Sequence, residues 1–163
     1  MPVIRTEIDR EALSLTVTAE FIATPERVWR LWADPRQLER WWAPPGWPAS
    51  FPRYEFEPSG EARYSMTGPE GEMSAAWFLF TAIDEPRRIE LVDGFAGEDG
   101  EPTDEMPSMR MVVEIAPSSG GGAVTTMSIR TIFDCNDDLE QITSMRMVEG
   151  MTAAMNQIDE LLA

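Results

Sequence analysis

The chain has 163 residues, of which 43% are hydrophobic and 9% aromatic, as expected for a single globular domain over residues 1–163. Its 29 acidic and 13 basic residues leave a formal charge of −16, which disfavours contact with nucleic acid or an anionic membrane. The absence of histidine and lysine and the single cysteine exclude a Ser-His-Asp or Cys-His nucleophile and a Schiff base, and leave few ligands for zinc, so we expect no metal and no cofactor.

The first regular pattern is LSLTVTAEF, residues 13–21, in which apolar and polar side chains alternate without interruption. Leu13, Leu15 and Val17 share one face with the apolar residues that follow, and hydroxyl and acidic side chains occupy the other face. This alternation predicts a half-buried strand.

Two short helices are predicted after this strand. Thr24 is a suitable N-cap and Pro25 a suitable first residue for a helix whose apolar positions have helical spacing. Pro35 ends that helix and opens a second one, which the stretch APPGWP, residues 43–48, then breaks.

The middle of the chain, from residue 50 to residue 133, has the pattern of antiparallel strands. Short alternating segments are separated by turns rich in glycine and proline, which predicts about six further strands. The stretch PSSGGG, residues 117–122, is predicted to be the hairpin loop between the last two strands.

Residues 137–163 contain neither proline nor a strong turn signal, and apolar residues recur every three or four positions. Asp137 and Glu140 make a start that resembles a capping box. We therefore expect one long amphipathic helix, on the order of 40 Å at 1.5 Å per residue. A long helix against a curved sheet buries the apolar faces of both, which indicates the α+β class.

Three stretches give the chain a resemblance to a known family: DPRQLERWWAPPG at residues 34–46, MTGPEG at 66–71 and DGF at 93–95. Together they resemble the SRPBCC (START-like) superfamily, and within it the branch named for the activator of the heat-shock protein 90 ATPase. The resemblance implies a helix-grip (START/Bet v-like) fold. In that fold a curved antiparallel sheet, here of about seven strands, wraps around a long C-terminal helix, with two short helices after the first strand and a deep cavity between sheet and helix.

The same resemblance implies a range of functions. Members of the superfamily mostly bind apolar small molecules, while some act as cyclases, hydrolases or chaperone cofactors. One position departs from the family pattern, because relatives often have a tryptophan directly after the helix glycine, whereas Met151 follows Gly150 here. This departure indicates an altered pocket.

The tryptophans at residues 41–47 admit three interpretations. They can plug the end of the sheet as core, line the cavity, or form an exposed surface for a partner. We expect most of the cluster to close one end of the cavity, with Trp41 or Trp42 near its mouth.

Methionines and a few polar side chains are the other candidates for a cavity wall. Methionine is flexible and fills irregular space, so the 11 methionines fit either an adaptable cavity or an ordinary core. Inward-facing polar groups need a partner, and for Asp93 we expect local capping of the turn before Gly94. The candidate ligand-binding residues are Trp41, Trp42, Tyr64, Met66, Asp93, Met109, Met111, Thr131, Met151 and Met155.

The leading hypothesis is a protein that binds a small hydrophobic ligand, aromatic or lipid-like, without covalent catalysis. One alternative is a cavity enzyme of cyclase or hydrolase type on a polyketide-like substrate, with Tyr64 or Asp93 as acid or base. The other is a co-chaperone-like module that binds a protein, and a homodimer stays open. A cavity without paired titratable groups would favour binding over the enzyme. The lone Cys135 and a charged N-terminal segment favour the cytoplasm.

Overall fold

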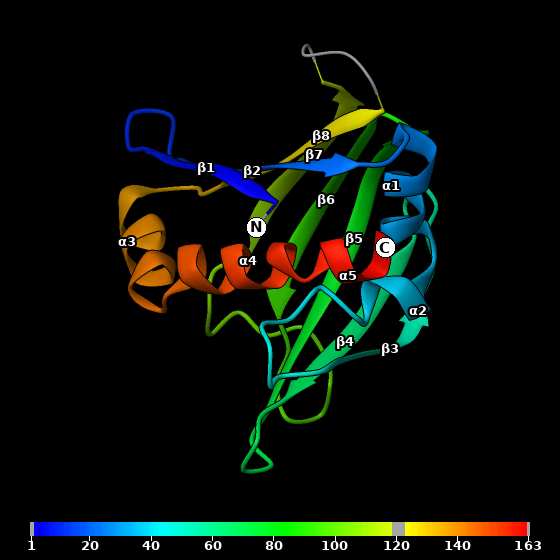
Figure 1. Cartoon of the computed structure of the whole chain (residues 1–163). Helices are drawn as coiled ribbons and strands as arrows, with labels where there is room; N and C mark the ends of the chain where they lie inside the picture. The colour runs from blue at the N-terminus through cyan, green and yellow to red at the C-terminus, as the bar shows by residue number, and fades with distance from the viewer. Residues whose placement is uncertain (1, 119–122, 163) are drawn as a thin grey trace.

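The computed structural model describes residues 2–118 and 123–162, and most of the predicted hairpin loop at 117–122 lies outside them. Within these described residues, eight strands and five helices form a curved sheet with helices on its concave side (Figure 1). In chain order they are β1 Val3–Asp9, β2 Ser14–Ile22, α1 Pro25–Ala33, α2 Pro35–Leu38, β3 Ala49–Tyr54, β4 Glu61–Thr67, β5 Met73–Asp84, β6 Arg88–Phe95, β7 Met109–Pro117, β8 Val124–Ile132, α3 Asn136–Ser144, α4 Met147–Asn156 and α5 Ile158–Leu162.

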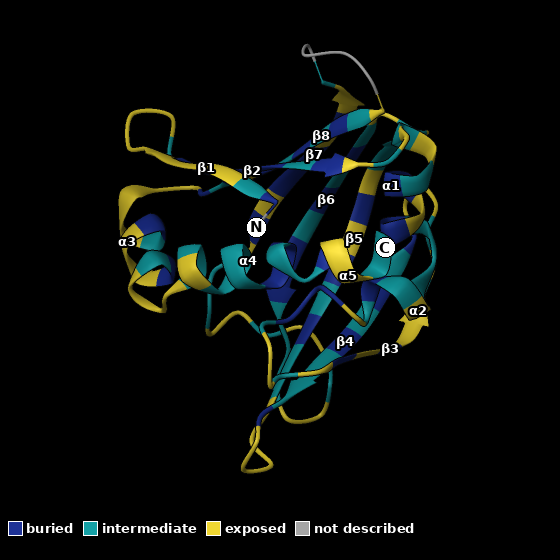
Figure 2. Cartoon of the chain, viewed as in Figure 1, coloured by how far each residue is buried: buried dark blue, intermediate teal, exposed yellow. Residues whose placement is uncertain are grey.

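The strands form one antiparallel sheet in the order β1-β2-β8-β7-β6-β5-β4-β3. The predicted helix-grip fold and α+β class are confirmed. The expected count of about seven strands misses β1, so two strands, rather than one, precede the short helices. β1 escapes sequence analysis because six of its seven residues are exposed on an edge strand, so burial imposes no hydrophobic alternation on them (Figure 2).

The C-terminal segment is not one continuous helix, as the sequence predicts, but three. Arg146 has φ 64° and ψ 37°, a left-handed conformation that cannot continue a right-handed helix, and it separates α3 from α4. Helix α3 begins close to the predicted start, yet its N-cap is Cys135 and no side chain caps it, so the expected capping box does not form.

The break lets the C-terminal segment contribute to two apolar cores. Leu139 and Ile142 of α3 pack with Met109 and Phe133 in a small cluster. Met155 of α4 and Ile158 of α5 belong instead to the main core against the sheet. In Figure 2 the buried residues of β5, β6 and β7 lie behind α4, where the helix crosses the sheet. No described helix is long and apolar enough to cross a membrane.

A cluster of three tryptophans closes one end of the sheet. Trp32 of α1 contacts Trp41 and Trp42 edge-on, with ring centroids 5.2 and 5.3 Å apart. The Trp41 indole N–H donates to the carbonyl of Leu31 at 3.0 Å, which satisfies the polar atom of a fully buried ring. Thr24 caps α1 by accepting from the N–H of Arg27, as the sequence predicts.

Position 94 of β6 requires a glycine because the ring of Trp77 lies very close to its backbone, on the face of the sheet opposite the tryptophan cluster. Trp77 of β5 pairs with Gly94, and its indole N–H donates to the carbonyl of Phe95 at 3.0 Å. A Cβ atom added at Gly94 would lie 2.4 Å from two ring carbons of Trp77. The flat ring over the glycine therefore fixes the backbone directly beside Asp93.

We predict that Gly94→Ala lowers the free energy of unfolding by about 1–3 kcal/mol, because the ring of Trp77 must move. Urea denaturation measures the loss. In a Trp77→Val background the same substitution should cost much less, since the ring is gone. An equal cost in both backgrounds would show that Trp77 is not the reason for the glycine.

Candidate ligand-binding site

A cavity of about 740 Å³, here called the main cavity, lies between the sheet and the helix α4. The strands β4, β5, β6 and β7 form one side, α4 with the residues before it forms the other, and the segment after α2 closes one end. Its wall consists of Trp42, Pro44, Pro45, Trp47, Tyr64, Met66, Ser74, Ala76, Asp93, Gly94, Phe95, Met109, Met111, Ile142, Met145, Arg146, Met147, Glu149, Gly150, Met151 and Ala153.

Strand register places the sheet side of the wall. Tyr64 of β4 pairs with Ala76 of β5, and Asp93 of β6 pairs with Met109 of β7, so these side chains share the inward face. Ala76 and the neighbouring inward residue Ser74 are small. A cavity forms here because a small side chain on the inward face leaves space that a larger one would fill.

Methionine and aromatic side chains give the wall its apolar character. Six of the 11 methionines line the cavity. At the aromatic end, Trp42 lies edge-on to Tyr64 with ring centroids 6.3 Å apart and edge-on to Phe78 at 5.2 Å. Trp42 is 7% exposed, so it contributes both to the tryptophan cluster and to the cavity wall.

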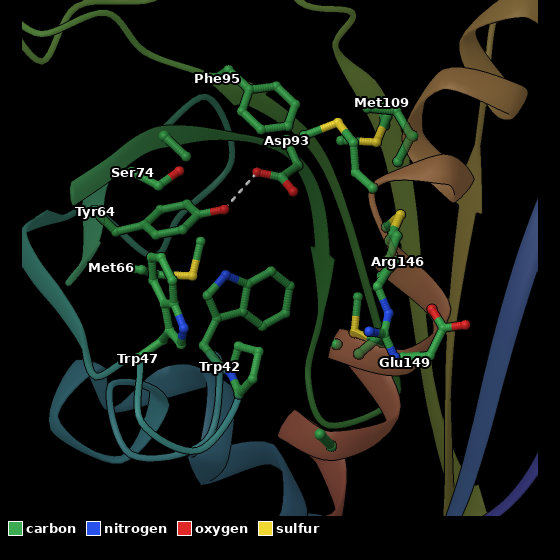
Figure 3. Close-up of a pocket in the computed structure, with 18 of the residues that line it drawn as sticks. Trp42, Trp47, Tyr64, Met66, Ser74, Asp93, Phe95, Met109, Arg146 and Glu149 are labelled. Atoms are coloured by element: carbon green, nitrogen blue, oxygen red, sulfur yellow. Dashed lines mark hydrogen bonds between the residues drawn. The ribbon is translucent and has the colours of Figure 1, made fainter. Parts of the chain in front are cut away.

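A single hydrogen-bonded pair of titratable side chains faces this apolar space. The Tyr64 hydroxyl donates to Oδ1 of Asp93 at 2.9 Å, and the two residues are 6% and 7% exposed (Figure 3). The contact crosses one strand, β5, on which Ala76 lies opposite Tyr64 and Phe78 opposite Asp93, and the small Ala76 leaves room for it. The expectation that Asp93 caps its own turn is therefore wrong, since Tyr64 is its partner.

Burial controls the ionisation of both groups. Loss of hydration raises the pKa of Asp93 from 3.8 to about 7, and the hydrogen bond from Tyr64 opposes that rise. Burial, and next the nearby Asp93 charge, raise the pKa of Tyr64 well above its usual value of 10.0. Near neutral pH the phenol thus remains a donor, while the carboxyl group exchanges between its charged and neutral forms.

The structure brings seven of the ten sequence-predicted residues to the cavity wall: Trp42, Tyr64, Met66, Asp93, Met109, Met111 and Met151. Trp41, Thr131 and Met155 lie outside it, which corrects their expected position. Trp41 is fully buried against Trp32 and is not at the mouth. Thr131 and Met155 do face inward, but at 1% and 0% exposure they are enclosed by core rather than by free space.

Sequence reasoning did not select several wall residues. The small inward pair Ser74 and Ala76 carried a usable signal, since small side chains at strand positions that face the core leave room for a ligand. Arg146 and Glu149 carried none, because a continuous helix was expected where the chain breaks. Across residues 2–118 and 123–162, no three His, Cys, Asp or Glu side chains are grouped to hold a metal ion.

Comparison with known proteins places this arrangement in a family. Residues 22–163 match the family described as "Activator of Hsp90 ATPase homolog 1-like protein". The chain is similar to protein Ms6760 from Mycobacterium smegmatis, with 40% sequence identity, 99% of this chain and 98% of that chain covered, and a TM-score of 0.90. It is also similar to a protein from Arthrobacter aurescens, with 44% identity, 96% and 90% covered, and a TM-score of 0.91.

No curated protein matches the chain. The family match covers most of the sequence, and the two structural relatives share both its fold and more than a third of its residues. The chain therefore belongs to the family of activator of Hsp90 ATPase homolog 1-like proteins.

Proposed function

We propose that this protein binds a small, mainly apolar molecule in the main cavity and holds a polar group of that molecule at Asp93 and Tyr64. The observation that carries the proposal is one buried polar pair in a cavity otherwise lined largely by methionine and aromatic rings. Ligand sites commonly have volumes of about 300–1,000 Å³, apolar walls and a few convergent polar groups. The cavity of about 740 Å³ has all three properties.

The rings at one end of the cavity favour a ligand with a flat aromatic part. Trp42 and Trp47 supply edges and faces at that end, and methionine adapts to irregular shapes. We place this binding in the cytoplasm, where the exposed thiol of Cys135 would remain reduced.

A second candidate function, catalysis by proton transfer, is favoured by the same pair. A carboxyl group whose pKa lies near 7 can act as a general base or acid at neutral pH, and Tyr64 can orient it. The variant Asp93→Asn distinguishes catalysis from simple binding, because only an enzyme has a turnover to lose. If the protein is an enzyme, the variant loses turnover while keeping its affinity for an apolar probe.

A co-chaperone role has less support. The large apolar side chains that are exposed among the described residues are Ile4, Ile8, Ile22, Met73, Leu79 and Met145. They are carried by β1 and its neighbour β2, by β5 and by the segment between α3 and α4. No single helix or strand of the described structure therefore offers a partner protein an extended apolar surface.

The cavity can be tested by filling it. Met151→Trp should abolish uptake of a neutral aromatic probe, N-phenyl-1-naphthylamine, with little change in stability, because Met151 borders free space. Met155→Trp is the matched control, four residues along the same helix but 0% exposed in the core. It should lower the free energy of unfolding by roughly 1–3 kcal/mol through overpacking.

Probe fluorescence and thermal unfolding of the parent protein and both variants give the answer. A parent protein that takes up no probe, together with equal destabilisation by both substitutions, would mean that Met151 is ordinary core. The proposed binding function would then be dropped.

The pKa of Asp93 predicts a pH dependence of stability. The folded protein holds a proton on Asp93 that the unfolded chain releases at lower pH, so the stability associated with this group is present below its unfolded pKa of 3.8. It is lost as pH rises through about 7. Asp93→Asn removes this loss, and its unfolding free energy relative to the parent should rise by roughly 2–3 kcal/mol between pH 5 and pH 7.5.

Urea denaturation at several pH values measures that difference, with Glu149→Gln as a control for the loss of one exposed carboxylate. If the difference in unfolding free energy between Asp93→Asn and the parent stays constant over this range, folding does not raise the pKa of Asp93, and the prediction is wrong.

A further inference from the structure

One oxygen of the buried carboxylate has no partner among the described residues. Oδ1 of Asp93 accepts from Tyr64, and within the described residues Asp93 makes no other hydrogen bond or ion pair. A side-chain oxygen without a partner is either fully enclosed by protein or open to free space. Among the described residues the only fully enclosed one is Oγ1 of Thr152, so Oδ2 of Asp93 is open to free space. Oδ2 therefore borders the open space of the main cavity.

The wall supplies no cation for this oxygen. Arg146 is the one basic residue on the described wall of the cavity; it is exposed and lies in the helix break. Figure 3 shows Arg146 beside Glu149 on the helix side, while Asp93 and Tyr64 face each other on the sheet side. A ligand that reaches Asp93 must thus bring its own complementary group.

The surroundings of Asp93 favour a positive group over a neutral one. A carboxylate in an apolar space is costly unless it is paired, and a cation restores the attraction that hydration provided outside. The rings of Tyr64, Trp42 and Phe95 line the same cavity, and aromatic faces attract cations within about 6 Å. A net charge of −16 further favours the approach of cations to this protein.

We propose that the ligand is a hydrophobic amine whose protonated nitrogen donates to Oδ2 of Asp93, while its apolar body lies against the methionines and tryptophans of the main cavity. This inference rests on the proposed binding function, and it specifies the chemical class of the ligand. Tyr64 acts as a positioning residue, because its hydroxyl occupies Oδ1 and leaves Oδ2 for the ligand.

A matched set of four naphthalenes tests the proposal. 1-Naphthylmethylamine carries a cation, 1-naphthalenemethanol a neutral donor, 1-naphthoate an anion, and 1-methylnaphthalene no polar group. All four are similar in size, and their affinities can be measured by fluorescence at pH 7.5. The amine should bind about tenfold or more tightly than the methyl compound and the alcohol, because a hydrogen bond to a charged group is worth more than a neutral one, and the anion should bind weakest.

Three variants assign the preference to one oxygen. Asp93→Asn should remove the preference for the amine while leaving the affinity for 1-methylnaphthalene within about twofold, which also shows that the variant folds. Tyr64→Phe keeps the carboxyl group but removes the hydrogen bond that favours its charged form, so it should weaken the preference at pH 7.5 and restore part of it at pH 8.5. Glu11→Gln, a matched control that removes one exposed carboxylate away from the cavity wall, should change neither affinity, and a lost preference in this variant would show that surface charge rather than Asp93 selects the amine and would overturn the proposal.

The failure of this inference and the failure of the proposed function give different results. If none of the four compounds binds, the proposed binding function fails. If 1-methylnaphthalene binds and the amine binds no more tightly, the cavity is real and the assignment of an amine ligand is wrong. If the anion binds best, Arg146 rather than Asp93 selects the ligand, and the proposal is again overturned.

Discussion

The main cavity depends on the edge-to-face packing of three tryptophans at one end of the sheet. Trp32, Trp41 and Trp42 hold one another at centroid distances of 5.2–5.6 Å. Because Trp41 is also bound to the carbonyl of Leu31, the cluster cannot easily slide into the neighbouring space. Within this cluster, Trp42 contacts Trp32 and Trp41 on one side and borders the cavity on another. An open space next to a fixed aromatic wall can admit a ligand without being filled by collapse of the core.

The inward face of the sheet supplies the second requirement, which is a polar group at a defined place. The small Ala76 lets Tyr64 reach across one strand to Asp93, and Gly94 under Trp77 fixes the backbone beside that carboxylate. Both proposed functions, ligand binding and proton transfer, rely on this pair, because burial makes it energetically sensitive to whatever enters the cavity. The pair is thus the feature of the cavity on which both proposals rest.

The helix break at Arg146 shapes the opposite side of the site. A left-handed residue without glycine's freedom is unfavourable by about 1–2 kcal/mol, so neighbouring packing must hold it. Here α3 packs into the smaller apolar cluster, which Val148 at the start of α4 also contacts, while Met155 near the end of α4 belongs to the main core. As a result the only basic residue of the described wall lies in the break, beside Glu149.

The sequence by itself determined the fold class, the single antiparallel sheet, the first two helices and seven of the residues that line the cavity, because alternation and helical spacing are local properties. It did not reveal β1, whose exposed residues are under no constraint of burial, or the break at Arg146, which spacing alone does not mark. Strand alternation for Thr131 and helical spacing for Met155 correctly predicted that both face inward. Only the tertiary structure decided that neighbouring side chains enclose them while Met151 borders free space. The same holds for Asp93. Its partner lies 29 residues away on another strand, and such a contact is set by the register of the sheet and the small residue between them, not by the local sequence.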